Sequence, residues 1–127
     1  MTETTLYQAT LVIYLVLAAL TFPLLLLVAA PYGRYADRPW QGPTLDNRLA
    51  WLLMEAPAAI VFALCFFVGA GHDTTVGRVF FLLWESHYLY RAFVYPFTLR
   101  GRGKRMPVLI AASAFVFNVA NGYLNGR

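Results

Sequence analysis

The sequence contains few charged residues and one cysteine. The first feature restricts the class of protein, and the second restricts the kinds of site that the chain can form. Only 13% of its 127 residues are Asp, Glu, Lys or Arg, while 60% are hydrophobic and 17% of the total are aromatic. Soluble domains are roughly 45–50% apolar, so this composition indicates an integral membrane protein. Because Cys65 is alone, no intrachain disulfide and no Cys-based metal site can form.

Recognisable metal-binding and nucleophile motifs are absent as well. His72 and His87 lie on different predicted elements, and no Cys-x-x-Cys, His-x-x-x-His or Glu-x-x-His pattern accompanies them. The chain has no glycine-rich phosphate fingerprint and no order of Ser, His and Asp that suggests a hydrolase. We therefore expect no metal site in this chain.

Four stretches are long and apolar enough to be predicted as membrane-spanning helices. The first has no charged residue over residues 6–30, and about 20 apolar residues suffice to cross a hydrocarbon core. Pro23 lies within it and should kink the helix. The predicted spans cover about 6–30, 48–69, 76–99 and 107–124. The predicted fold class is therefore all-α, a multi-pass transmembrane bundle with four helices in one domain, residues 1–127.

Basic residues are distributed unevenly over the polar connections between these spans. Arg78 and Arg127 are the basic residues on one side of the membrane. The basic residues of the first and third connections, at about 31–47 and 100–106, lie on the other side. The positive-inside rule places these two connections in the cytoplasm and the N-terminus outside, in a bacterial inner membrane or the endoplasmic reticulum. The cytoplasmic side would carry Arg34, Arg38, Arg48, Arg100, Arg102, Lys104 and Arg105.

This asymmetry accounts for most of the net charge of +4, and nucleic-acid binding explains it less well. The turn Arg-Gly-Arg-Gly-Lys-Arg at 100–105 could also bind phosphate groups of a lipid or a dinucleotide. Membrane lipids are therefore expected partners, and nucleic acid is not.

A polar cluster at 85–91 interrupts the third predicted span, where ionisable groups are costly and usually functional. Residues at spacings of three and four share one face of a helix, and two such stripes stand out. We expect both to face the interior of the bundle. The stripe of the third span consists of Trp84, Tyr88, Arg91 and Tyr95. The stripe of the second span consists of Trp51, Glu55, Ala58 or Ala59, and Phe62.

Helical rise gives the depth of the polar groups below the cytoplasmic interface. At about 1.5 Å per residue, Glu55 lies roughly 10 Å in, Arg91 roughly 13 Å and Tyr88 roughly 18 Å. The two helices run antiparallel, so these three side chains could meet in one layer. An unpaired carboxylate there would be expensive, and Glu55 should be protonated, paired with Arg91, or hydrogen-bonded to a hydroxyl such as that of Tyr88.

Two interpretations of this layer remain open from the residues alone. A Tyr88 hydroxyl held by a buried carboxyl could polarise a carbonyl in a water-poor site. Alternatively, Glu55 and Arg91 form an ion pair that only fixes helix packing, and Tyr88 fills space. Glu85 and His87 are expected to be scaffolding in either case.

The last predicted span ends with an unusual density of amides. Asn118 and Asn121 are three residues apart and share a face. They could supply amide groups to a ligand or bridge to a neighbouring helix.

Five ordered blocks across nearly the whole chain resemble the N-terminal half of the steroid 5-alpha-reductase family. That family also includes polyprenol reductases and very-long-chain enoyl reductases. The blocks are Pro-Tyr-Gly-Arg-Tyr-Ala at 31–36, Trp-Leu-Leu-Met-Glu-Ala-Pro at 51–57, His-Tyr-Leu-Tyr-Arg-Ala-Phe-Val-Tyr at 87–95, Arg-Gly-Arg at 100–102 and Asn-Gly-Tyr-Leu-Asn-Gly at 121–126.

The resemblance implies a seven-helix membrane bundle in which NADPH delivers hydride to the beta carbon of an enone. A Glu and Tyr pair holds the substrate carbonyl in that family, and the matching residues are Glu55 and Tyr88. By the same resemblance Trp51, Met54 and Phe117 would line the substrate cavity. The residues expected to face the cofactor are Arg91, Tyr95, Arg102 and Asn121.

The chain departs from the family pattern in two residues and in length. Met54 stands where the family usually has Gln, and Leu99 where it commonly has Asn. The resemblance covers about half of the family length, so the chain is expected to be the N-terminal part of an enzyme, inactive without the remaining helices that enclose NADPH. The implied reaction is reduction of a 3-oxo-Δ4-steroid to its 5-alpha product. The alternatives are a polyprenol or enoyl thioester reductase, and a non-catalytic membrane subunit or lipid-binding bundle.

Overall fold

The structure is a computed structural model that describes residues 2–27, 42–99 and 103–127. Its contacts divide the chain into two units, residues 1–41 and residues 42–127. The all-α fold class is confirmed, and the described part of each predicted span is helical except at the terminal residues Gly69, Leu99 and Pro107. Among the described residues, three helices are long and apolar enough to cross a membrane, and they are α1 (Glu3–Leu27), α2 (Asn47–Val68) and α5 (Val108–Gly126).

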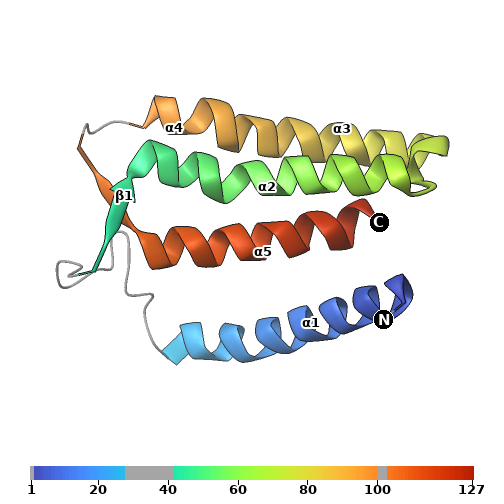
Figure 1. The fold of residues 1–127 in the computed structure, drawn as a ribbon, viewed down its shortest axis with the longest axis horizontal. Helices are drawn as coiled ribbons and strands as arrows, with labels where there is room; N and C mark the ends of the chain where they lie inside the picture. The colour runs from blue at the N-terminus through green and yellow to red at the C-terminus, as the bar shows by residue number, and fades with distance from the viewer. Residues whose placement is uncertain (1, 28–41, 100–102) are drawn as a thin grey trace. The chain divides into compact units, whose positions relative to one another are not determined.

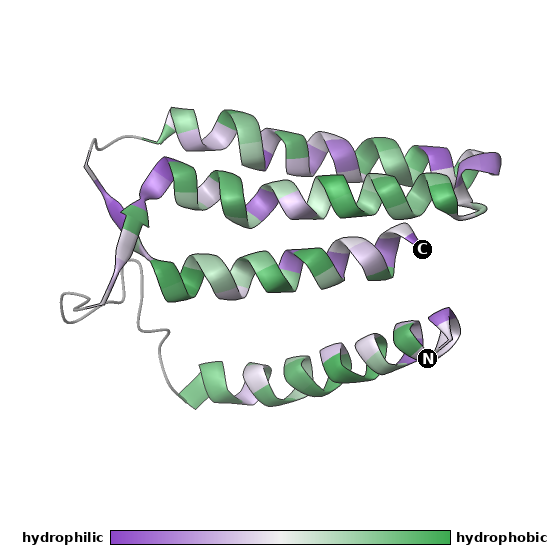
Figure 2. Cartoon of the chain, viewed as in Figure 1, coloured by the Kyte–Doolittle hydropathy of each residue, from purple (hydrophilic) through white to green (hydrophobic). Residues whose placement is uncertain are grey.

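The described part of the first unit is one helix, α1 (Glu3–Leu27), which agrees with the first predicted span. The Thr2 hydroxyl accepts a hydrogen bond from the Thr5 amide at 3.3 Å and so satisfies one amide at the start of the helix. Beyond its N-terminal turn the helix is mostly apolar (Figure 2), and none of its side chains is buried. A helix that is hydrophobic all round suits lipid or another apolar helix.

The second unit is built around α2, which lies between α5 and the helical run that contains α3 and α4 (Figure 1). The described elements are β1 (Thr44–Asp46), α2 (Asn47–Val68), η2 (Gly71–Asp73), α3 (Thr75–Leu89), η3 (Tyr90–Val94), α4 (Tyr95–Thr98), β2 (Arg105–Pro107) and α5 (Val108–Gly126).

A short antiparallel ladder joins β1 to β2, with Leu45 opposite Met106. Arg105 reinforces it by donating from Nε to the Thr44 hydroxyl at 2.6 Å and from Nη2 to the Thr44 carbonyl at 2.7 Å. Asp46 then caps α2, since its carboxylate accepts from the Arg48 amide at 2.9 Å. The ladder brings the segments before α2 and α5 to the same end of the unit, as the predicted topology requires.

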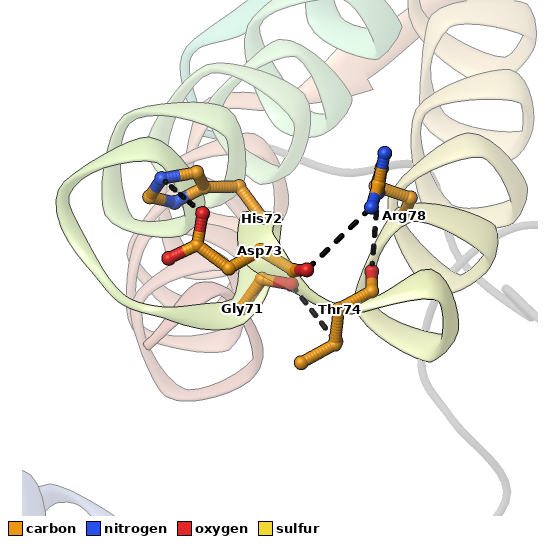
Figure 3. A network of polar contacts seen from close by, with 5 residues as sticks. All are labelled: Gly71, His72, Asp73, Thr74 and Arg78. Carbon is orange, nitrogen blue, oxygen red and sulfur yellow. Dashed lines mark hydrogen bonds and ion pairs between the residues drawn. The ribbon is translucent and has the colours of Figure 1, made fainter.

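At the opposite end, a tight turn connects α2 to α3 (Figure 3). The Thr74 hydroxyl accepts from the Gly77 amide at 2.9 Å, which caps α3, and donates to the Gly71 carbonyl at 3.1 Å. Arg78 donates to the Thr74 carbonyl at 3.4 Å, and His72 lies 3.4 Å from the Asp73 carboxylate. These local bonds satisfy several polar groups of the turn, although not His72 Nδ1 within the described residues, and let α3 return alongside α2.

Small residues allow α5 to pack closely against α2. Gly122 and Gly126 are one turn apart and buried, and they face the backbone of α2. A Cβ at Gly126 would lie 2.5 Å from the Phe62 carbonyl oxygen, and one at Gly122 would lie 3.0 Å from the Phe62 amide nitrogen. Helix pairs in membranes use such small residues to bring their backbones together.

Aromatic rings fill the contact between α2 and α3. Phe62 is fully buried, and its ring centroid lies 4.8 Å from that of Trp84 and 5.9 Å from that of Phe81. The Trp84 indole also donates to the Ala58 carbonyl at 3.1 Å. The stripe predicted for the second span therefore faces the third, and this prediction is confirmed.

The third predicted span is helical from Val76 to Thr98 but is not one regular α-helix, which corrects the sequence-based expectation. Its middle is the π-helical turn η3, where the Tyr95 amide donates to the Tyr90 carbonyl five residues back. Pro96 explains the change, because it has no N–H for the Ala92 carbonyl and its ring would collide with that carbonyl in an α-helix. Such π turns are frequent at functional sites.

We expect Gly126→Ala and Gly122→Ala to lower the free energy of unfolding by about 1–3 kcal/mol, because each methyl group overpacks the contact with α2. In an open helix the same change would stabilise by up to about 1 kcal/mol, so the sign of the effect is diagnostic. Unfolding of the purified protein in detergent measures it. Ser113→Ala on the exposed side of α5 is the control, and glycine variants as stable as this control would contradict the packing.

Candidate functional site

An ion pair between α2 and the π turn lies at the centre of the candidate site. Arg91 Nη2 donates to Glu55 Oε1 at 2.6 Å, and the two side chains are 37% and 6% exposed respectively. Of the three states expected for Glu55, the structure has the pair with Arg91. Glu55 makes no hydrogen bond to Tyr88 within the described residues.

Two aromatic residues hold the arginine side of this pair. The Arg91 guanidinium carbon lies 5.0 Å from the centroid of the Trp51 ring, a distance at which the cation is attracted to the ring. Trp51 in turn meets Tyr95 edge to face, with centroids 4.9 Å apart. Trp51 and Glu55 are one turn apart on α2, so a single face of this helix contacts both ends of the π turn.

Tyr88 connects this layer to α5. Its hydroxyl accepts a hydrogen bond from Asn121 Nδ2 at 3.0 Å, and its ring lies 4.7 Å from Trp84. Within the described residues the hydroxyl donates no hydrogen bond, so its proton is free for another acceptor. Tyr88 thus has a fixed oxygen and an uncommitted proton.

The structure brings together six of the residues predicted for the site. Met54 precedes Glu55, and its carbonyl accepts from Asn118 Nδ2 at 2.6 Å. Phe117 is 54% exposed, and Arg102 lies outside the described residues. The predicted roles of all these residues in binding substrate or cofactor stay predictions. The six that lie together are Trp51, Glu55, Tyr88, Arg91, Tyr95 and Asn121.

Glu85 and His87 lie beside this group but are not joined to it by hydrogen bonds. Glu85 Oε1 is buried without a partner in the described part of the chain. His87 is exposed, and its ring meets the edge of Tyr88 at 5.1 Å. Neither side chain contributes a donor to the Tyr88 hydroxyl.

The sequence leaves open whether Asn118 binds a ligand or bridges to a neighbouring helix, and the structure has the bridge. Sequence reasoning missed the backbone contact of Trp84 and the support that Asn125 gives to Asn121. Asn118 and Trp84 each donate to a carbonyl of α2, on either side of Pro57. Asn125 donates to Asn121. An isolated amide in an apolar helix is the available signal, since it must find a partner there, but the sequence does not say which partner.

Comparison with known proteins identifies relatives of this chain. No protein-family model matches it. Steroid 5-alpha-reductase DET2 of Arabidopsis thaliana is 36% identical over 112 residues, which cover 84% of this chain and 42% of the relative. The chain is related to the steroid 5-alpha-reductases. The relative named 3-oxo-5-alpha-steroid 4-dehydrogenase 1 of Bos taurus is also 36% identical, over 87% of this chain and 44% of its own length.

A third relative, steroid 5-alpha-reductase DET2 of Solanum lycopersicum, is 31% identical over 89% of this chain and 45% of its own length. The resemblance inferred from the five sequence blocks is therefore confirmed. The chain spans about half the length of the curated relatives it matches.

We expect Arg91→Met to lower the free energy of unfolding by about 1–3 kcal/mol, because it leaves the Glu55 carboxylate buried without a cation. The loss should be smaller than the roughly 3–5 kcal/mol typical of fully buried pairs, since the Arg91 side chain is partly exposed. Unfolding in detergent compares this variant with Arg48→Met, which removes an exposed arginine. Equal stability of the two variants would show that the ion pair does not stabilise the fold.

Proposed function

We propose that this chain supplies the carbonyl-binding part of an integral membrane, NADPH-dependent reductase of enones, with 3-oxo-Δ4-steroids as the substrate class. The names of the relatives in plants and cattle support this choice. Three apolar helices support a site reached from the lipid, where steroids partition.

The observation that carries the proposal is the state of the Tyr88 hydroxyl. It lies on a helix of the bundle, accepts one hydrogen bond from Asn121 and keeps its own proton. A donor held in place before the reaction stabilises charge that develops on a carbonyl oxygen without reorganising during it. Tyr88 is therefore the residue proposed to hold the substrate carbonyl.

Reduction of an enone places negative charge on that oxygen. Hydride adds to the beta carbon, the electrons move to the carbonyl oxygen, and a proton then adds at the alpha carbon. Tyr88 stabilises the enolate oxygen by donating its hydrogen bond most strongly at this stage. The saturated ketone that results carries the 5-alpha hydrogen when the substrate is a 3-oxo-Δ4-steroid.

Glu55 acts in this proposal through Arg91. The carboxylate is compensated by the guanidinium 2.6 Å away, so it can remain ionised in the span. The pair carries no net charge, so its part in this proposal is to hold the Arg91 guanidinium in the layer that contains Tyr88. The catalytic pair proposed from the sequence, Glu55 and Tyr88, thus acts with Arg91 as an intermediate residue.

The described residues fit a bound NADPH at Arg91. Arg91 Nη2 donates to Glu55, and the Arg91 side chain is 37% exposed. Its remaining N–H groups can therefore donate to a phosphate or carboxamide oxygen of the cofactor. Tyr95 lies on the same side, against Trp51. NADPH supplies the hydride when it is bound.

Tyr88→Phe in the full-length enzyme should lower kcat about 100- to 1,000-fold, as expected for loss of one donor to a developing oxyanion. KM should change less, because the hydrogen bond is strongest in the transition state. Steady-state kinetics with a 3-oxo-Δ4-steroid and NADPH measure both constants. Tyr90→Phe, in the same segment but 52% exposed, is the control. Near-normal turnover by Tyr88→Phe would contradict the proposal.

Substrate class can be decided by NADPH consumption. The full-length protein should oxidise NADPH with a 3-oxo-Δ4-steroid and more slowly with a polyprenal or an enoyl thioester, although all three have a polarised carbonyl on an apolar body. Faster consumption with either of the other two would overturn the steroid assignment and keep the carbonyl-binding role of Tyr88. No consumption with any of them would favour a non-catalytic membrane subunit.

A further inference from the structure

We propose that Asn125 is a positioning residue that sets the direction of a hydrogen-bond chain through Asn121 to Tyr88. The direction leaves the Tyr88 proton available for a substrate carbonyl. This inference rests on the proposed function of Tyr88 and deepens it. Asn125 itself touches neither Tyr88 nor the carbonyl.

The orientation of the Asn125 amide is fixed by an acceptor that cannot be reversed. Asn125 Nδ2 donates to the backbone carbonyl oxygen of Asn121 at 2.9 Å. A backbone carbonyl only accepts, so the amide nitrogen of Asn125, and not its oxygen, must face Asn121. The second N–H of the same nitrogen donates to Asn121 Oδ1 at 3.1 Å.

That second bond fixes the Asn121 amide in turn. Because its oxygen is occupied by a donor from Asn125, its nitrogen points the other way, toward Tyr88, at 3.0 Å from the hydroxyl oxygen. Asn121 therefore donates and Tyr88 accepts. The hydroxyl proton is left to point away from α5.

The reverse orientation of Asn121 would present an oxygen to Tyr88. The hydroxyl would then donate its proton to the amide, and a substrate carbonyl would meet a lone pair instead of a donor. Each bond in a chain that runs in one direction also polarises the next, by about 10–30% per bond. Asn125 thus favours the productive state of Tyr88 in two ways.

The chain also explains why two amides, Asn121 and Asn125, lie near the end of α5. Asn121 and Asn125 are one turn apart and lie on the same face of the helix. Gly122 and Gly126 follow each of them by one residue and allow α5 to approach α2 closely. The approach brings Asn121 within reach of α3, where Tyr88 lies.

Isotope-edited infrared spectroscopy tests the direction of the chain without NADPH. The probe is a 3-oxo-Δ4-steroid with 13C at its carbonyl, bound to the protein, and a hydrogen bond to the oxygen lowers the carbonyl stretching frequency. Asn125→Asp removes the donor to Asn121 and supplies only acceptors. We expect it to raise the frequency toward the value in Tyr88→Phe, and Asn121→Asp to raise it at least as far.

Three controls separate this effect from a general disturbance. Asn125→Gln keeps a donor and should retain the wild-type frequency. Asn47→Asp adds the same charge at the other end of the unit and should also retain it. The double variant Tyr88→Phe with Asn125→Asp should match Tyr88→Phe alone, because Asn125 is expected to act only through Tyr88.

The outcomes distinguish this inference from the proposed function. A raised frequency in Tyr88→Phe together with a wild-type frequency in Asn125→Asp would overturn the role of Asn125 and leave Tyr88 in place. Equal frequencies in wild type and Tyr88→Phe would overturn the proposed function.

A second measurement decides the direction of the chain in the protein without steroid. In that state the 13Cζ resonance of Tyr88, assigned through Tyr88→Phe, should move downfield in Asn125→Asp as the hydroxyl becomes a donor. An unmoved resonance would contradict the proposed direction.

Discussion

The need to neutralise a carboxylate inside a membrane helix is the constraint on which the rest of the second unit depends. Glu55 is buried on α2, and its charge is tolerable because Arg91 reaches it from the neighbouring helical run. This requirement sets the register between the two helices. It places Trp51 beside the guanidinium, and it brings the start of the π turn alongside Glu55, with Tyr88 three residues before Arg91.

A second helix pair completes the site by close backbone contact. The glycines of α5 lie directly on α2, and the same helix carries the amides that reach both neighbours. Asn118 holds the carbonyl before Glu55, while Asn121 holds the hydroxyl of Tyr88. Amides in an apolar helix need partners, and here each partner is a group next to, or part of, the proposed chemistry. Packing and function therefore use the same polar bonds.

The sequence predicted the features that follow from hydrophobic periodicity and charge cost. Four helical stretches and the facing stripes through Glu55 and Arg91 could be inferred from spacing, whereas the pairing of these two residues is one of three states that the sequence leaves open for Glu55. The π turn could not, because Pro96 permits either a kink or a widened turn and only neighbouring contacts decide. The ladder between Leu45 and Met106 has strands too short to leave a periodic pattern. The direction of the amide bonds at Asn125 depends on a contact across one turn, which spacing allows but does not require.

A structure of the protein with a bound 3-oxo-Δ4-steroid tests the central claim most directly. Tyr88 Oη is predicted to lie about 2.5–3.0 Å from the steroid carbonyl oxygen, within the range of O–H···O hydrogen bonds. Asn121 should still donate to Tyr88 in that complex, and Arg91 should still pair with Glu55. A steroid whose carbonyl oxygen lies elsewhere, with the Tyr88 hydroxyl donating to Asn121 or to no ligand, would contradict the account.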